Sequence, residues 1–476
     1  MPAQKKTKIV ATLGPATAKR EVLRDMILEG VNVFRVNFSH ANYDDVKERV
    51  AMIREINEEL DITTAILADL QGPKLRVGVM KEEVVVQPGD VISFCTGKEF
   101  EGTSKKVYMN YDNFPQDVKP GERVLLDDGK LMFQVISTDG KSEVKTKVIQ
   151  GGPLRSKKGV NLPNTEISLP ALTEKDREDA IFAISLEVDW IALSFVRHAE
   201  DCKELQAIIQ EHSDYKIPII AKIEKPEAVA NIEKIIAFCD GLMVARGDLG
   251  VEIPAEEVPL IQKELVVKAK RARIPVIIAT QMMETMISTL TPTRAEVNDV
   301  ANSVMDGADA VMLSGETSVG KYPVEVIKTM AKICKSVEDS HLIQVPQEPP
   351  HIKTNRYITK SICYHAALMA NEIDARAICT LTNSGYTAFQ ISAWRPDAHI
   401  LVFTSNKRIL SRLNLLWGVK AFYYDRYVST DETVDDVNKI ACNKKFVKKG
   451  EYLINLAAMP IIDKGMVNTL RVSQVK

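Results

Sequence analysis

Eight short apolar runs divide the first two thirds of the chain, and their pattern predicts buried strands. The runs cover residues 8–14, 31–38, 65–70, 189–195, 218–223, 241–246, 275–280 and 310–315. Most are rich in Val, Ile and Ala without polar alternation, as expected of strands that are buried on both faces. Amphipathic stretches long enough for a helix separate most of the runs. Eight strand–helix units predict an α/β fold, a (β/α)8 barrel of the TIM type.

Nearly every reactive side chain lies at or just after the end of one of these runs. In (β/α)8 barrels the loops that follow the strands converge on one axial mouth, where the chemistry takes place. We therefore expect one site built from Thr12, residues 35–40, Asp69, residues 222–224, residues 246–248, Thr280 and Glu316. Together these cations, carboxylates and hydroxyls suit the binding of a phosphate and a hard divalent cation.

The strand–helix rhythm stops after Pro73 and resumes near Leu169. From about residue 74 to 162, short β-like stretches alternate with turn sequences such as Gln-Pro-Gly-Asp at 87–90 and Asp-Asp-Gly at 127–129. This texture predicts a small β-rich domain inserted between the third and fourth barrel strands. Both of its connections lie at the catalytic end, so the domain could close over the site as a lid. An insertion without a function is the alternative.

The last third of the chain predicts a separate domain. A proline-rich polar segment at 345–350 is typical of a linker. After it, candidate strands at 377–382, 399–404 and 452–456 alternate with helical stretches, as in an α/β domain. The predicted organisation is a barrel domain from residues 1–72 and 165–344, an inserted domain at 73–164, and a C-terminal domain at 345–476.

Glu224 and Asp248 are candidate ligands of a divalent metal. Each follows a predicted strand directly, and the two strands are consecutive. Mg²⁺ takes oxygen ligands, commonly one or two carboxylates, and leaves its remaining positions to water and substrate. Among 64 acidic residues, either one alone would be interpreted as an ordinary surface acid. Their matched positions favour a site for Mg²⁺ or Mn²⁺.

Two basic residues share strand faces with other polar groups. Lys222 lies two residues before Glu224, and Arg35 two residues before Asn37, so strand alternation puts each pair on one side. An arginine there suits bidentate phosphate binding. The lysine could stabilise a transferring phosphoryl group or an enolate, or form a Schiff base as in aldolases. A neighbouring divalent ion makes the Schiff base less natural.

Composition narrows the function classes. A length of 476 residues predicts two or three domains, and a net charge of −2 gives no sign of a nucleic-acid partner. Seven cysteines without a CxxC pair fit a reducing compartment, and we find neither a signal peptide nor a membrane-spanning run, so we expect a cytoplasmic protein without a membrane partner. The Gly-rich segment at 315–321 lacks the hydroxyl residue that would complete a P-loop.

With these residues assembled, the chain resembles the pyruvate kinase family over essentially its whole length. The segments that carry the resemblance are 12–16, 35–40, Asp69 with Gly72 and Pro73, 222–224, 245–250, 279–282, 292–296 and 312–317. The resemblance implies a barrel, a small β-barrel lid and a C-terminal α/β regulatory domain. It also implies the last step of glycolysis, in which phosphoenolpyruvate and ADP give pyruvate and ATP.

The resemblance implies roles for individual residues. Catalysis would involve Lys222, Arg35 and Thr280, and the divalent metal would be held by Glu224 and Asp248. Substrate contacts would be Arg35, Lys222, Gly247, Asp248 and Thr280, and nucleotide or phosphate contacts would be Asn37, Phe38, Ser39, His40 and Arg76. His198 stands where the family usually carries a basic residue that contacts the nucleotide, which leaves that contact open.

The segment that leads into the lid differs from potassium-dependent members of the family. Those members carry Thr, Lys and Glu where this chain has Leu70, Gln71 and Lys74. In them a bound K⁺ lies near the positions of Asn37, Ser39 and Asp69. The resemblance therefore implies an enzyme that does not require K⁺, with the ammonium group of Lys74 in its place.

The C-terminal domain is predicted to bind a phosphorylated effector. The candidate phosphate contacts follow a predicted strand and are Thr382, Asn383, Ser384, Gly385 and Thr387. A simple helix cap is the alternative for this segment. The resemblance also implies a homo-oligomer, most often a tetramer in the family.

Two other functions stay open at this point. A metal-dependent aldolase or lyase acting on an enolpyruvate could use the same lysine and carboxylates, and a catalytically silent regulator could bind a phosphosugar. The inserted lid favours a kinase, because a second, bulky nucleotide must be enclosed. The intact set of Lys222, Glu224 and Asp248 argues against a silent regulator.

Overall fold

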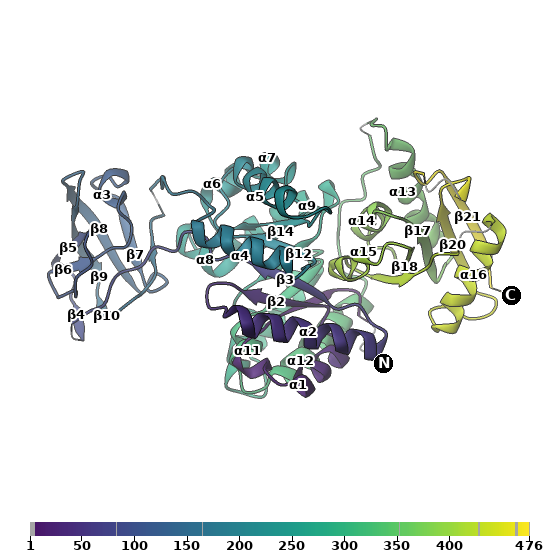
Figure 1. Ribbon diagram of the computed structural model, residues 1–476, viewed down its shortest axis with the longest axis horizontal. Helices are drawn as coiled ribbons and strands as arrows, with labels where there is room; N and C mark the ends of the chain where they lie inside the picture. The colour runs from purple at the N-terminus through teal and green to yellow at the C-terminus, as the bar shows by residue number, and fades with distance from the viewer. Residues whose placement is uncertain are drawn as a thin grey trace.

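The computed structural model describes residues 5–81, 83–163, 165–351, 353–426, 429–461 and 465–475. Three bodies lie in a row, with the barrel in the middle, the inserted β-rich segment at one end and the C-terminal segment at the other (Figure 1). Each body has a hydrophobic core of its own buried residues, and further clusters line the barrel interior and the second face of the C-terminal sheet.

Eight parallel strands close into a barrel, which confirms the predicted fold. Each strand lies inside one of the eight apolar runs: β1 (Lys8–Thr12), β2 (Val33–Asn37), β3 (Ala65–Asp69), β12 (Trp190–Leu193), β13 (Ile219–Ile223), β14 (Gly241–Ala245), β15 (Val276–Ala279) and β16 (Ala310–Leu313). Around the barrel the strands follow the order β1-β16-β15-β14-β13-β12-β3-β2.

Helices surround the barrel and connect its strands. They are α1 (Arg20–Glu29), α2 (Tyr43–Leu60), α4 (Glu174–Ser185), α5 (Ala199–His212), α6 (Pro226–Ala230), α7 (Ile232–Ile236), α8 (Arg246–Glu252), α9 (Val258–Ala272), α10 (Arg294–Met305), α11 (Gly315–Ser318) and α12 (Pro323–Asp339), with short 3₁₀ turns η1 (Pro15–Thr17) and η2 (Glu284–Ile287). Helix α4 begins directly after Thr173, because Thr173 and Asp176 form a capping box.

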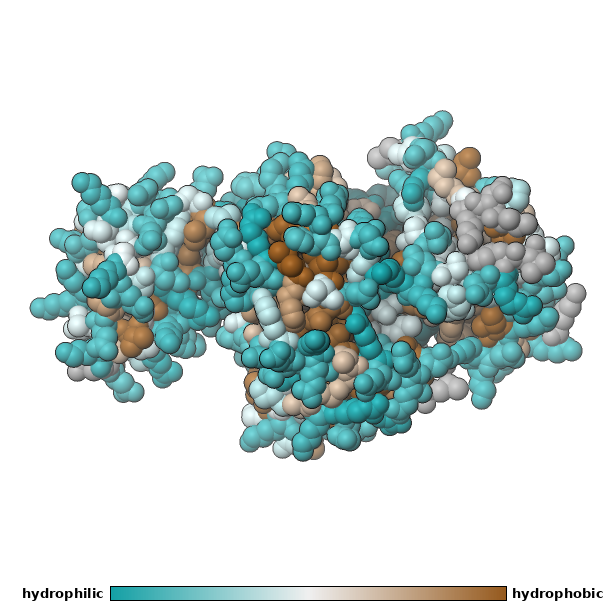
Figure 2. Space-filling view, viewed as in Figure 1, coloured by the Kyte–Doolittle hydropathy of each residue, from teal (hydrophilic) through white to brown (hydrophobic). Residues whose placement is uncertain are grey.

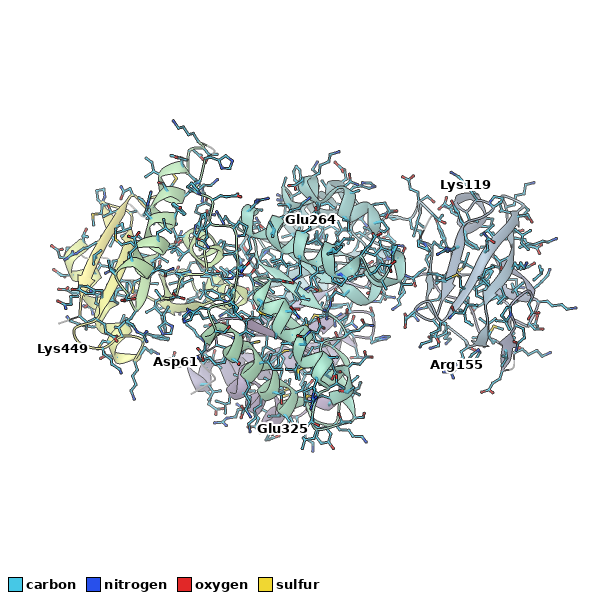
Figure 3. The ribbon with its side chains drawn as sticks, turned by 180° about the vertical axis from the view of Figure 1, so that it is seen from behind. Asp61, Lys119, Arg155, Glu264, Glu325 and Lys449 are labelled. Carbon is cyan, nitrogen blue, oxygen red and sulfur yellow. The ribbon has the colours of Figure 1, made fainter. Side chains whose placement is uncertain are left out.

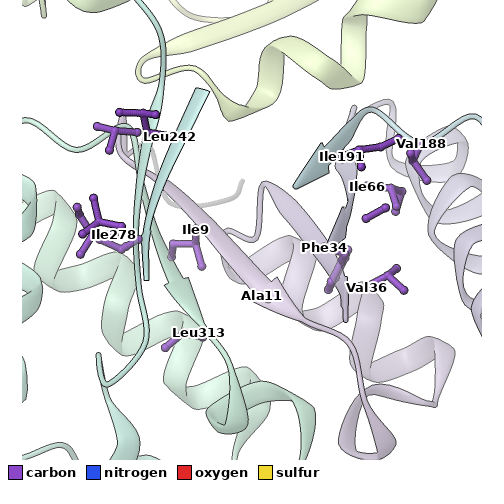
Figure 4. Packing of buried hydrophobic residues seen from close by; sticks show 14 of the residues in the cluster. Ile9, Ala11, Phe34, Val36, Ile66, Val188, Ile191, Leu242, Ile278 and Leu313 are labelled. Carbon is purple, nitrogen blue, oxygen red and sulfur yellow. The ribbon is translucent and has the colours of Figure 1, made fainter. Parts of the chain in front are cut away.

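Alternation along the strands divides their side chains between two cores. One set, which includes Ile9, Phe34, Ile66 and Leu242, joins the cluster that the strands share with the surrounding helices (Figure 4). The other set, for example Val10, fills the barrel interior. Because these strands are buried on both faces, their sequences are continuous hydrophobic runs.

The inserted segment consists mainly of β structure. Its elements are β4 (Val84–Val86), β5 (Val91–Cys95), β6 (Lys106–Tyr108), α3 (Phe114–Asp117), β7 (Arg123–Leu126), β8 (Leu131–Thr138), β9 (Glu143–Gln150), β10 (Gly152–Leu154) and β11 (Val160–Asn161). Six strands form one sheet in the order β11-β7-β8-β9-β5-β6, and β10 pairs with β4. Arg76 forms a bridge with Gly159 beside β11, and Val77 forms one with Met109 beside β6. Residues 76–77 thus join the two edges of the six-stranded sheet, in agreement with the predicted small β-barrel. We call the whole inserted segment the lid.

The C-terminal segment holds a five-stranded sheet with helices. Its elements are α13 (Tyr357–Glu372), β17 (Ala377–Leu381), α14 (Tyr386–Ala393), β18 (His399–Thr404), α15 (Arg408–Arg412), η3 (Leu413–Leu415), β19 (Val419–Tyr423), α16 (Thr430–Asn443), β20 (Tyr452–Ala457) and β21 (Thr469–Gln474). The strand order is β19-β18-β17-β20-β21. The three predicted strands are confirmed, and the sequence analysis missed β19 and β21. The exact domain bounds stay a prediction.

The surface is mainly hydrophilic in the view of Figure 2, with apolar side chains gathered near the middle of the molecule. Asp61 lies on the side of the barrel that faces the C-terminal segment (Figure 3), where it pairs with Lys444 at 2.5 Å. Within the described ranges, no helix has the length and apolar character needed to cross a membrane.

Candidate active site

Strand alternation directs the predicted charged residues into the mouth of the barrel. Leu67 and Ile220 belong to the interior cluster. Asp69 and Lys222 lie two residues further along the same strands, and Glu224 lies four residues beyond Ile220. Because side chains alternate with a period of two, all three charged groups point to the interior side at the carboxyl end of the barrel.

The ammonium group of Lys222 is the centre of a buried polar cluster. Its Nζ lies 3.2 Å from Asp69 Oδ1 and 3.0 Å from Glu224 Oε1, and it donates to Ser194 Oγ at 2.6 Å. The side chain of Lys222 is 11% exposed, and those of the two carboxylates are 1% exposed. Three separate strands or strand ends thus fix the orientation of one cation.

Arg35 completes the cluster from β2. Its Nε donates to Asp69 Oδ2 at 2.5 Å, and its Nη1 donates to Thr12 Oγ1 at 3.1 Å. Asp69 therefore bridges the two cations that the sequence analysis selected. Two like charges repel strongly in a buried site. The Asp69 carboxylate lies between Arg35 and Lys222 and offsets this repulsion.

The charges in the cluster shift one another's pKa values. Burial alone would lower the pKa of Lys222, but Asp69 and Glu224 outweigh it and raise that pKa above its usual value. Burial works to raise the pKa of Asp69, yet Arg35 and Lys222 bring it below its ordinary range. At neutral pH the lysine is a cation and the aspartate an anion, as charge stabilisation requires.

Glu224 and Asp248 have the features of a pair of metal ligands. Burial raises the pKa of Glu224, Lys222 opposes this, and the nearby charge of Asp248 raises it further. Two carboxylates that repel each other at a barrel mouth suit a divalent cation, which needs a few oxygen ligands from protein. No group of three metal-ligating side chains was found among the described residues, so water and substrate oxygens would complete the coordination.

The backbone directly after β15 is held in an unusual conformation. Thr280 and Gln281 have positive φ values of 70° and 55°, and such conformations cost about 1–3 kcal/mol for residues other than glycine. Thr280 Oγ1 accepts a hydrogen bond from the Gly247 N–H at 2.7 Å and donates to the Ala279 carbonyl at 2.6 Å. These contacts bring Gly247 and Thr280 together, as predicted.

Glu316 and the predicted nucleotide contacts lie in different surroundings. Glu316 is buried and accepts from the N–H groups of Met283 and Ser314. His40 is exposed, Asn37 and Ser39 are partly exposed, and the ring of Phe38 is buried. The Phe38 N–H donates to the Asp69 carbonyl, and the Phe38 carbonyl accepts from Lys175 Nζ at 3.0 Å. Arg76 lies in the lid and donates to the Lys157 carbonyl at 2.9 Å.

A cleft of about 50 Å³ lies between the lid and the barrel. Its walls include Lys74, Asn161, Arg197, Lys225 and Asp248. Lys74 is exposed and Leu70 is buried, at 1% exposure. Within the described residues, no ion pair joins the Lys74 ammonium to Asp69.

Contacts at the two lid connections were not predicted. Asp176 accepts from the Gly72 N–H at 3.0 Å, and Arg197 donates to the carbonyls of Ile167 and Leu169. His198 directly precedes α5 as its N-cap, and its Nδ1 lies 3.3 Å from Asn231 Nδ2. These partners are far apart in the sequence, and no local pattern could have found them.

The predicted effector segment forms the turn before α14. The Thr382 hydroxyl accepts from the Gly385 N–H at 3.0 Å, and Gly385 has φ 80°. Asn383 and Ser384 are exposed, whereas Thr387 is buried with its hydroxyl 2.8 Å from Thr380 Oγ1. The turn therefore presents three of the five predicted contacts to solvent at least in part.

Comparison with known proteins agrees with this arrangement. The family model described as "Pyruvate kinase, barrel domain" matches residues 4–327, and the one described as "Pyruvate kinase, alpha/beta domain" matches residues 360–473. The chain is 42% identical to the pyruvate kinase of Corynebacterium glutamicum, over 98% of this chain and 97% of the relative.

Another relative and a solved structure are also similar over nearly the whole of this chain. Pyruvate kinase of Geobacillus stearothermophilus is 42% identical, over 98% of this chain and 80% of the relative. The crystal structure of a pyruvate kinase from Cryptosporidium parvum superposes with a TM-score of 0.92 at 32% identity, covering 99% of this chain and 97% of that one. The matched barrel and C-terminal domains, together with full-length identity of this degree, show that the chain belongs to the pyruvate kinase family.

Proposed function

We propose that the protein transfers the phosphoryl group of phosphoenolpyruvate to ADP, giving pyruvate and ATP. The observation that carries this proposal is the buried Lys222 ammonium, held by Asp69, Glu224 and Ser194 at the mouth of the barrel. Phosphoryl transfer needs mainly positioning and charge neutralisation. A fixed cation beside a pair of carboxylates supplies both.

Lys222 and Arg35 bind the phosphoryl group in this proposal. As the phosphoryl group leaves the enol oxygen for a β-phosphate oxygen of ADP, charge spreads over its equatorial oxygens. Lys222 stabilises that charge, and Arg35 offers a planar donor pair to the phosphate. Because Asp69 fixes both cations beforehand, little reorganisation is required in the transition state.

Glu224 and Asp248 hold the divalent cation, Mg²⁺ or Mn²⁺. The two buried carboxylates of the cluster already neutralise Lys222 and Arg35, so an incoming phosphate and carboxylate need further positive charge. A divalent cation held by these two carboxylates would supply that positive charge. This balance of charges supports a requirement for a divalent metal.

Thr280 positions the group that protonates the enolate. Its hydroxyl is held between the Gly247 N–H and the Ala279 carbonyl, which fixes its place at the mouth of the barrel. A water molecule at Thr280 can deliver the proton to the methylene carbon of the enolate, giving the methyl group of pyruvate. Gly247 and Asp248 contact the substrate from the start of α8.

The nucleotide binds between the barrel and the lid. In this proposal Asn37, Phe38, Ser39 and His40 contact the nucleotide from the barrel, and Arg76 contacts it from the lid. Because the contacts come from both domains, closure of the lid over a bound nucleotide would shield the transfer from water.

We further propose that activity does not require K⁺. Lys74 places a fixed positive charge beside the cleft, and a second cation about 4 Å from it would cost roughly 4 kcal/mol at an effective dielectric of 20. Leu70 also removes a hydroxyl ligand. Lys74→Glu should lower activity without K⁺ and make part of it recoverable by adding K⁺.

The direct test is ATP formation from phosphoenolpyruvate, ADP and Mg²⁺ in buffer free of Na⁺ and K⁺, with a tetraalkylammonium salt holding the ionic strength. We expect full activity in this buffer and loss of activity when Mg²⁺ is chelated. Activity that collapses without K⁺ and returns on its addition would reject K⁺ independence. No activity in either buffer would reject the function.

A phosphorylated effector and a homotetramer complete the proposal. The exposed part of the turn before α14 supports binding of a sugar phosphate or AMP, and a change in the apparent KM for phosphoenolpyruvate on adding either would test it. Strand β21 is an edge strand with Val472 43% exposed, which supports pairing with another copy. The mass of the assembly in solution tests the tetramer.

A further inference from the structure

Glu252, at the end of α8, connects the lid to the proposed metal site. Its Oε1 accepts a hydrogen bond from Lys225 Nζ at 2.7 Å and another from Asn161 Nδ2 at 2.9 Å. Asn161 belongs to β11, the last strand of the lid, and Lys225 directly follows Glu224. One carboxylate oxygen therefore contacts both the lid and the segment that carries a proposed metal ligand.

These contacts are shielded from solvent. The side chain of Glu252 is 1% exposed and that of Lys225 is 6% exposed. The second oxygen of Glu252, Oε2, is buried and has no hydrogen-bond partner among the described residues. The two donors on Oε1 are thus the polar contacts that fix this carboxylate, and losing one of them matters more than it would at the surface.

Helix α8 carries the other proposed ligand and contacts the lid a second time. Asp248 and Glu252 are four residues apart, so they lie on the same face of the helix. At the start of the helix, Arg246 pairs with Asp299 and donates to the Thr280 carbonyl. Near its end, Val251 lies close to Gly129 of the lid, and Glu252 accepts from Asn161. The barrel holds one end of α8, and the lid contacts the other.

We propose that Glu252 is a positioning residue that couples lid docking to the order of both metal ligands. When the lid is docked, Asn161 fixes the Glu252 carboxylate, which holds Lys225 beside Glu224 and fixes α8 one turn after Asp248. When the lid moves away, Glu252 loses this donor and both ligands lose order. The inference rests on the metal site of the proposed function and adds regulation of that site by the lid.

Thermodynamic linkage makes the effect reciprocal. If the docked lid strengthens metal binding, then metal binding must favour the docked lid by the same factor. The divalent cation would therefore promote closure before any substrate arrives. This coupling needs no contact between the lid and the metal itself, because Glu252, Lys225 and α8 link them.

Asn161→Ala tests the coupling, because it removes only the lid's donor. We expect Mn²⁺ binding without substrates to weaken roughly five- to tenfold, at the lower end of coupling between linked sites. Hydrogen exchange should become faster in peptides that cover α8 and residues 127–130. Gln134→Ala is the matched control, because the Gln134 amide donates to the Gly121 carbonyl inside the lid. The control should behave like the wild type in both measurements.

Glu252→Gln provides a second, independent variant. It keeps an oxygen acceptor but removes the charge that holds Lys225, so it should weaken Mn²⁺ binding as well. Because both substitutions act on one network, Asn161→Ala should add little when Glu252 is already changed. Fully additive losses would contradict a shared connection.

Unchanged Mn²⁺ affinity in Asn161→Ala would overturn the proposal, even if exchange in the lid becomes faster, because Asn161 would then serve only the lid. A wild type that binds no Mn²⁺ would overturn it together with the metal site. Neither measurement requires turnover. A protein that passes both tests and fails to make ATP would reject the proposed reaction while leaving the coupling intact.

Discussion

At the scale of single residues, burial decides what each charged group can do. Lys222 and Arg35 remain cations in a buried cluster because Asp69 pairs with both. Asp189 at the opposite end of the barrel shows the other outcome. Its Oδ2 accepts from the Ile66 N–H at 2.8 Å, and burial raises its pKa to about 7, although Arg412 and Arg54 oppose the shift.

Asp189→Asn should therefore stabilise the protein in a pH-dependent way. With a pKa raised from 3.8 to about 7, the wild-type group favours the folded state fully below pH 3.8, and this contribution is lost as pH rises through 7. Asparagine keeps an oxygen acceptor without a buried charge. Thermal unfolding should show a higher Tm for the variant at pH 8 and a smaller difference near pH 5. An equal difference at both pH values would contradict the raised pKa.

At the scale of elements, the two connections between the lid and the barrel pack close to the proposed metal site. Gly72 has φ 70°, and a Cβ there would lie 2.7 Å from a ring carbon of Phe195. The N–H of Phe195 in turn donates to Glu224 Oε2 at 2.7 Å. The first hinge of the lid thus packs directly against a residue that holds a proposed metal ligand.

Gly72→Ala should damage both stability and catalysis. The backbone conformation alone costs a side chain about 1 kcal/mol or more, and the collision with Phe195 should displace the Glu224 carboxylate. We expect a lower Tm together with a lower kcat. Gly89→Ala is the control, since Gly89 also has a positive φ, 98°, but has no atom within 4 Å of its Cβ position. A loss of kcat no greater than that of the control would refute the role of the Phe195 contact.

Elements differ in how far their sequence predicts them. The barrel strands are apolar on both faces and were found from their composition. Strand β19 contains Lys420 and ends in an exposed Tyr423, and β21 is an edge strand with alternating exposure. Neither strand forms a continuous apolar run, so the hydrophobic pattern did not predict them.

Some residues of the candidate site could be predicted from the sequence, and others could not. Positions after a strand, such as Lys222 and Glu224, follow from period-two alternation. Ser194 and Glu252 act through partners 28 and 27 residues away, and no spacing in the sequence encodes such contacts. The roles of the predicted nucleotide and effector residues stay predictions.

At the scale of the whole molecule, a buried ionic cluster fixes the C-terminal domain to the barrel. Arg395 Nη2 lies 3.0 Å from Asp309 Oδ1 and donates to the Gly307 carbonyl at 2.7 Å. Asp309 precedes β16 and also pairs with Lys270. All three charged side chains are at most 3% exposed, so the C-terminal domain is tied to the end of the barrel opposite the active site.

Arg395→Met should loosen this connection. Removing one partner of a buried pair costs about 3–5 kcal/mol, and calorimetry should show the C-terminal domain unfolding in a separate, earlier transition. Arg376→Met is the control, because Arg376 pairs with Glu451 at 3.6 Å inside the C-terminal domain and is 57% exposed. Such exposed pairs contribute about 1 kcal/mol or less. A single transition at the wild-type temperature would show that Arg395 does not couple the domains.

We propose that the Lys222 cation stabilises the phosphoryl group during its transfer. The most direct measurement is the rate of ATP formation from phosphoenolpyruvate and ADP with Mg²⁺, in the wild type and in Lys222→Met, which keeps the bulk of the side chain without its charge. Lys216→Met is the control, because Lys216 is 62% exposed and pairs with Asp240. We predict that Lys222→Met lowers kcat at least about 10²-fold, with a smaller change in KM, while the control retains wild-type activity. A Lys222→Met variant with kcat within a few-fold of the wild type would contradict the claim.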